Sequence, residues 1–194
     1  MSTSTLIRLG GLAAMVGGVL FLAFPPLAFS FAFLASPPFG AHQAAFSLVI
    51  VAVLLVPVGM VGFHILQRHG YGRMGLVGFW LVVLASLVVA LGVADFFVWG
   101  DFLQDEPPVW LGLGLLILLL GFVIYGVATL QARVLPRWCG VAFIVALPVA
   151  LAVGVLLGPF ASMSIVFGIA WLALGYALWG RRAALAEQPR RRVR

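Results

Sequence analysis

The side chains that could carry chemistry in this sequence are few, and three of them lie near the same predicted boundary of a membrane. Asp95 lies near the end of an apolar run, His42 shortly before another run, and Asp101 in the connection that follows Asp95. An ionisable side chain in a membrane segment is a functional hypothesis by default. Asp95 also lies at the carboxyl end of its predicted helix, where the helix dipole disfavours an anion. Asp95, His42 and Asp101 are therefore the candidate residues of an outward-facing cation or proton site.

A structural alternative for Asp95 is that its carboxylate reaches the lipid headgroup region and is simply hydrated. The choice between a buried and a solvated Asp95 stays open in the sequence. His64 and His69 lie near the other predicted boundary, where a histidine is more often an interfacial residue than a ligand.

Other chemistries require residue sets that the sequence lacks. Haem ligation in a membrane commonly uses histidines on facing helices, and only His64 lies near the core of a run. The zinc pattern H-E-x-x-H, the nucleophile pattern G-x-S-x-G, the phosphate-binding loop and the dinucleotide fingerprint do not occur. A single cysteine, Cys139, leaves no internal disulfide or thiolate metal cluster. We expect no enzymatic activity, no metal and no cofactor.

The composition predicts that lipid is the solvent of the chain. Of 194 residues, 64% are hydrophobic and 8% charged, whereas soluble domains are about 45–50% apolar and about 25% charged. Six runs approach the ~20 apolar residues of a spanning helix, and a helix is the only assignment that satisfies their backbone in lipid. We predict an all-α bundle of six transmembrane helices as one domain, residues 1–180, and a disordered basic tail, 181–194. The runs are about Leu6–Phe24, Phe46–Ile65, Gly75–Phe97, Trp110–Leu130, Trp138–Leu157 and Ser162–Trp179.

The arginines predict the orientation. All eleven basic residues are arginines, and they lie at the start of run one, between runs two and three, between runs four and five, and after run six. The other three connections contain neither arginine nor lysine. By the positive-inside rule both termini are cytoplasmic. Every acidic residue except Glu187 then lies on the outer side, and the basic distribution indicates lipid rather than nucleic acid as the partner.

Runs one, three and five begin in the same way. A glycine follows within three residues of each of Arg8, Arg73 and Arg137. The near-equal spacing of these arginines predicts three parallel two-helix hairpins related by an axis along the membrane normal. The alternative is that any six-helix chain with short loops shows such a period. A true duplication and a coincidence of loop lengths both stay open.

Small residues and prolines predict how the helices pack. Pro57 and Pro148 should kink their helices, and the segment from Pro25 to Gly40 should lie in the outer interface as an uncharged aromatic connection. Glycines on one helix face permit close approach of a neighbouring helix, within this chain or in a second copy. These packing glycines are Gly154, Gly158, Gly114, Gly121, Gly168 and Gly175.

The function expected from these features is that of a non-enzymatic accessory or structural protein of a bacterial cytoplasmic (inner) membrane, in contact with lipid and with other membrane proteins or itself. The alternative is a small transporter for a proton, a cation or an apolar solute, with Asp95 in its outer entry. The all-arginine usage is typical of a GC-rich bacterial genome. We expect the tail to contact anionic headgroups through Arg181, Arg182, Arg190, Arg191, Arg192 and Arg194.

Overall fold

The computed structural model describes residues 3–32, 41–68, 70–96, 108–157 and 159–191, with backbone alone at 28–32, 41–45, 157, 159–162 and 181–191. These residues form six helices, and each contains a segment long and apolar enough to cross a membrane. The all-α fold and the six spans predicted from the sequence are confirmed, and the chain is a multi-pass membrane protein by helix length and hydropathy. The helices are α1 (Thr3–Ala32), α2 (Ala41–Gln67), α3 (Gly72–Ala94), α4 (Val109–Ala132), α5 (Arg137–Leu157) and α6 (Pro159–Arg191).

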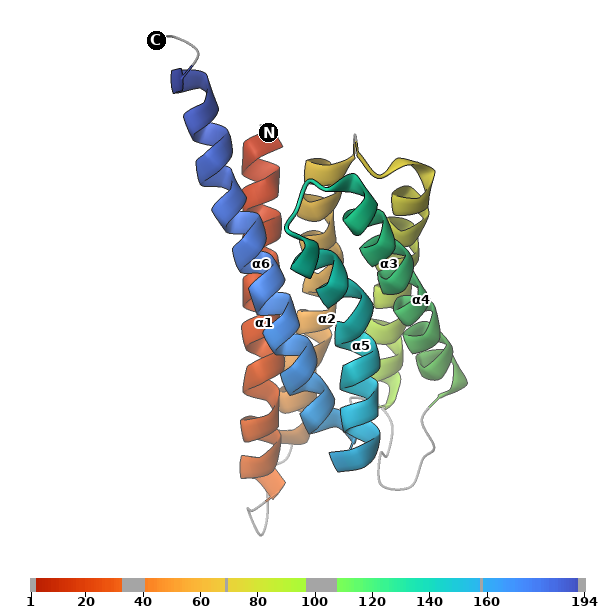
Figure 1. Cartoon of the computed structure of the whole chain (residues 1–194). Coiled ribbons are helices and arrows are strands. Elements are labelled where there is room, and N and C mark those ends of the chain that lie inside the picture. Colours follow the sequence, from red (N-terminus) through yellow and green to blue (C-terminus); the bar gives the residue numbers. More distant parts are fainter. Residues whose placement is uncertain (1–2, 33–40, 69, 97–107, 158, 192–194) are drawn as a thin grey trace.

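The helices form a closed ring in which each packs against its neighbours in the sequence, and α1 also packs against α6. Successive helices run in opposite directions, so α1 begins and α6 leaves the bundle at the same end (Figure 1). We call this the arginine end, because Arg8, Arg73 and Arg137 lie near or at the starts of α1, α3 and α5 there. The opposite end, where α3 finishes, is the Asp95 end.

Two helices are longer than their apolar runs. α1 continues through Pro25 and Pro26 to Ala32, so the first part of the connection predicted from Pro25 is helical. Prolines are tolerated in membrane helices because neighbouring groups satisfy the freed carbonyls. α6 continues past Gly180 to Arg191, where we had predicted a disordered tail. The segment after Gly180 is rich in arginine and alanine, which are strong helix formers.

The seam between α1 and α6 depends on glycines that bring the two backbones together. A Cβ on Gly18 would lie 2.8 Å from the carbonyl oxygen of Gly168, and a Cβ on Gly168 would lie 2.9 Å from that of Gly18. One heptad along each helix, a Cβ on Gly175 would lie 2.9 Å from the carbonyl oxygen of Gly11. Real Cβ atoms do not approach backbone oxygens so closely, so larger residues would separate the helices.

The glycines of α4 lie against α3. A Cβ on Gly121 would lie 2.9 Å from the backbone nitrogen of Val82, and one on Gly114 would lie 3.1 Å from a methyl group of Val89. Gly154 in α5 is buried, and Gly158 lies outside the described residues.

Candidate functional site

The structure describes the predicted acidic site only in part. Asp95 is exposed on the surface of the bundle directly after α3, and its backbone N–H contacts the carbonyl oxygens of Gly92 and Leu91 in the last helical turn. His42 is the second residue of α2, but its side chain lies outside the described residues, as does the whole of Asp101. The grouping of Asp95, His42 and Asp101 therefore stays a prediction.

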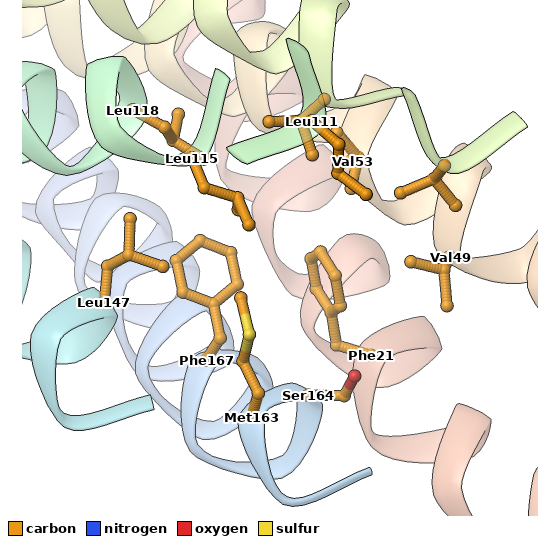
Figure 2. Close-up of a pocket in the computed structure, with 12 residues that line it drawn as sticks. Phe21, Val49, Val53, Leu111, Leu115, Leu118, Leu147, Met163, Ser164 and Phe167 are labelled. Carbon is orange, nitrogen blue, oxygen red and sulfur yellow. The ribbon is translucent and has the colours of Figure 1, made fainter. Parts of the chain in front are cut away.

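A cavity of about 90 Å³ lies inside the bundle towards the Asp95 end (Figure 2). Its wall includes Val93, two residues before Asp95, whereas Asp95 itself is not part of the wall. All six helices contribute to the wall. One representative from each, in chain order, is Phe21, Val49, Val89, Leu115, Leu147 and Met163.

The wall of this cavity is apolar except for one hydroxyl group. Ser164 is the single polar residue among the described wall residues, and it is buried with an interaction of its own. Water needs two to four polar partners to occupy a cavity, so one this apolar stays dry. An empty volume of about 90 Å³ would cost about 2 kcal/mol at ~24 cal/mol per Å³. The cavity can thus accept an apolar group, but it offers no counterion to a proton or cation.

A cluster of aromatic rings closes the cavity on the side of the arginine end. Phe167, which lines the cavity, stacks on Trp171 with ring centroids 5.9 Å apart, and Phe122 lies edge-on to both. Phe143 stacks on Phe122 at 5.9 Å, and Phe63 packs edge-on against Phe143 at 5.2 Å. Such pairs add about 0.5–1.5 kcal/mol each beyond their area burial. We call these five rings the aromatic plug.

Beyond the aromatic plug, polar side chains meet inside the bundle. Gln67, at the end of α2, donates a hydrogen bond from Nε2 to the hydroxyl oxygen of Tyr125 on α4, at 3.4 Å. Both residues are fully buried, and Tyr125 packs edge-on against Phe143 of the plug. The other amide atom, Gln67 Oε1, is buried without a hydrogen-bond partner. A buried acceptor in that state carries a desolvation cost of about 1–3 kcal/mol.

A second polar pair continues this group towards the arginine end. The Tyr71 hydroxyl and His64 Nδ1 are hydrogen-bonded, and the Tyr71 ring lies edge-on to Tyr125 at 5.7 Å. The ring of Tyr71 lies directly over Gly75, where a Cβ would meet it at 1.9 Å. Burial raises the pKa of Tyr71 to about 12. We call His64, Gln67, Tyr71 and Tyr125 the polar cluster.

The sequence does not predict the polar cluster. We had weighed His64 as an interfacial residue or a ligand, and Gln67 and Tyr125 formed no part of the predicted site. Tyr71 was also not part of the predicted site. The position of Tyr125 depends on the close packing of α3 on α4, since a Cβ on Gly78 would lie 2.7 Å from the backbone nitrogen of Tyr125.

At the surface of the arginine end, the guanidinium carbon of Arg8 lies 5.2 Å from the ring centroid of Trp179. This cation–π contact joins the start of α1 to α6. The side chains of Arg181, Arg182 and Arg190 to Arg194 lie outside the described residues, so their predicted headgroup contacts stay a prediction.

Comparison with known proteins adds no relative: no protein-family model matches the chain, and no curated protein or solved structure is significantly similar to it.

Proposed function

We propose that this protein is a non-enzymatic accessory or structural component of a bacterial cytoplasmic membrane, with both termini in the cytoplasm. In this arrangement the arginine end faces the cytoplasm, and the basic continuation of α6 contacts anionic headgroups. The three helix pairs α1–α2, α3–α4 and α5–α6 would be parallel repeats of one hairpin. The near-equal spacing of Arg8, Arg73 and Arg137 supports the repeat.

The observation that carries the proposal is the distribution of polar groups between the helices. Among the described residues, the buried polar side chains besides the tyrosines and the indole of Trp171 are Gln67, Ser86, Thr129 and Ser164. Ser86 and Thr129 donate to carbonyl oxygens of their own helices, at 2.7 and 2.9 Å. Gln67 and Ser164 lie on opposite sides of the aromatic plug. This distribution favours a packed scaffold over a hydrophilic path.

The surface of the bundle carries large apolar side chains on every helix, which suits contact with lipid and with partner helices. A photoreactive amino acid at one lipid-facing position per helix would locate a partner in native membranes. We expect cross-links to one protein from two neighbouring helices only, and none from the buried control position Val56. Lipid adducts from all six helices, with no protein cross-link, would contradict the accessory role. Suitable positions are Leu12, Val51, Leu84, Leu116, Val145 and Ile169.

The second candidate function is a small transporter, and the cavity near the Asp95 end favours its apolar-solute version. A proton or cation pathway would use polar wall residues near Asp95, whereas the described wall is apolar apart from Ser164. Proteoliposomes with an internal pH-sensitive dye separate the accessory role from the proton version of the transporter. The accessory role predicts a proton leak equal to that of protein-free liposomes, and no change in Asp95→Asn. A flux above the leak that Asp95→Asn abolishes would instead support the transporter.

A further inference from the structure

The cavity near the Asp95 end is unevenly enclosed. Its described wall takes three residues each from α4 and α6 and two each from α2 and α3, but only Phe21 from α1 and only Leu147 from α5. The glycine seam holds α1 closely against α6. α5 stands between α4 and α6 in the ring, and near its far end the side chains of Val155 and Leu156 are 86% and 79% exposed. The thin part of the described wall that faces the surrounding medium is therefore at α5.

The cavity also reaches the surface of the bundle. Three of its wall residues, Val49, Leu115 and Met163, are only partly buried, whereas Phe21 and Phe167 deeper in the cavity are 6% and 7% exposed. Figure 2 shows these side chains converging on one space from several helices. Phe21 and Phe167 pack edge-on at 5.1 Å and form part of its inner boundary.

The surrounding medium decides which molecules can enter. Around apolar spans this medium is lipid hydrocarbon, and lipid tails are as apolar as leucine side chains. A hydrocarbon chain therefore gains no hydrophobic free energy by entering, but it restores the dispersion contacts that wall atoms facing an empty space lack. The described wall carries no charged side chain that could hold a headgroup.

The size of the cavity limits the occupant further. Its volume of about 90 Å³ is below the ~150 Å³ at which an engineered apolar protein cavity takes up benzene or xenon. A whole lipid cannot fit, but a few methylene groups of one chain can, while the remainder of the chain stays among its neighbours in the bilayer.

We propose that this cavity binds a segment of one acyl chain of a membrane lipid, which enters beside α5 and ends against Phe167 of the aromatic plug. The site is an intramembrane lipid site distinct from the surface shell of lipid. It goes beyond the accessory role proposed above and requires no transport.

Photo-labelling tests the proposal on the full chain in lipid nanodiscs. The probe is a phosphatidylcholine that carries a diazirine in one acyl chain, and adducts are mapped by peptide mass spectrometry after irradiation. We expect adducts on Phe167, which is buried in the cavity, and none on Val56, which is also buried but does not line the cavity. Adducts on both or on neither would overturn the proposal.

Variants that fill the cavity from two different helices provide the second arm. Val53→Phe and Val89→Phe place a ring in the cavity, and Val51→Phe on the same helix as Val53 is the control, because Val51 is 48% exposed. We expect each filling variant to lower labelling of Phe167 about tenfold, because the empty volume that favours binding is removed. The control should leave it unchanged. Undiminished labelling in a folded filling variant would overturn the proposal.

A third arm distinguishes the source of the chain. A free diazirine-bearing alkane, added to nanodiscs of unmodified lipid, would label Phe167 alone if the cavity took small apolar solutes rather than lipid. Labelling by the free alkane without labelling by the phospholipid would overturn the proposal. Gel filtration and thermal unfolding of each variant verify that it is folded, and the comparison of Phe167 with Val56 needs no variant.

Discussion

Gln67 and Tyr125 form a hydrogen bond of 3.4 Å that joins α2 to α4 within an apolar bundle. These helices are not neighbours in the ring of six, so the bond crosses its interior. Gln67 presents its amide nitrogen to the tyrosine and leaves Oε1 without a partner. The pair thus combines one satisfied and one unsatisfied buried group.

A double-mutant cycle on this pair has a defined expected outcome. Tyr125→Phe should lower the free energy of unfolding by about 0.5–1 kcal/mol, the range of hydrogen bonds between membrane helices. Gln67→Leu should have a small net effect, because it removes the unpartnered acceptor but leaves the buried Tyr125 hydroxyl group without its partner. In the Gln67→Leu background, Tyr125→Phe should therefore be neutral or stabilising. Unfolding in mixed detergent micelles measures the change in the free energy of unfolding for each variant. If the change in the double variant equals the sum of the two single changes, the bond contributes nothing.

The glycine seam between α1 and α6 predicts a large effect of one methyl group. In Gly18→Ala the new Cβ would lie 2.7 Å from the backbone nitrogen of Leu172, so the helices must move apart. We expect a loss of about 1–3 kcal/mol, the usual cost of overpacking. Gly112→Ala is the matched control, since nothing lies within 4 Å of its Cβ position. There alanine should be neutral or slightly stabilising through its helix propensity. Equal thermal stability of the two variants would contradict the close packing of α1 on α6.

Alkaline titration tests the burial of Tyr71. Because its pKa is raised from 10.0 to about 12, the folded state holds the phenol proton more tightly than the unfolded state. The resulting contribution to stability is complete below pH 10 and is lost as the pH rises towards 12. In Tyr71→Phe, the absorbance of the phenolate band should show that one fewer tyrosine is titrated at high pH than in the unsubstituted protein. If Tyr71→Phe instead removes a tyrosine that titrates near pH 10, the result would contradict this account.

The sequence predicted the helices well and their contacts poorly. Apolar run length alone identified six spans, because lipid leaves the backbone few alternatives to helix. The end of α1 was missed because Pro25 and Pro26 resemble a stop signal, although proline is tolerated in such a helix. The sequence shows that Gly168 and Gly175 lie on one face of their helix. It does not show that this face packs against Gly11 and Gly18, because that contact forms only when α6 closes the ring against α1.

The site was harder to predict than the fold. Charge drew attention to Asp95, which the structure places in an exposed position after α3. The polar cluster instead consists of uncharged or weakly titratable side chains from three segments of the chain. Their types and spacing carry no pattern, and only packing brings Gln67 to Tyr125. The cavity is still less visible in sequence, because its wall consists of ordinary valine, leucine and phenylalanine residues.

Orientation in the membrane is the claim on which the cytoplasmic arginine end, the lipid contacts of α6 and an outer Asp95 all depend. In a Cys139→Ala background, single cysteines at Ser4→Cys, at Asp101→Cys and after Arg194 can be tested in intact cells with a membrane-impermeant maleimide. The account predicts that Asp101→Cys reacts at once, whereas the two cysteines near the chain ends react only after the cells are opened. Labelling of the carboxyl-terminal cysteine in intact cells, or protection of Asp101→Cys there, would contradict it.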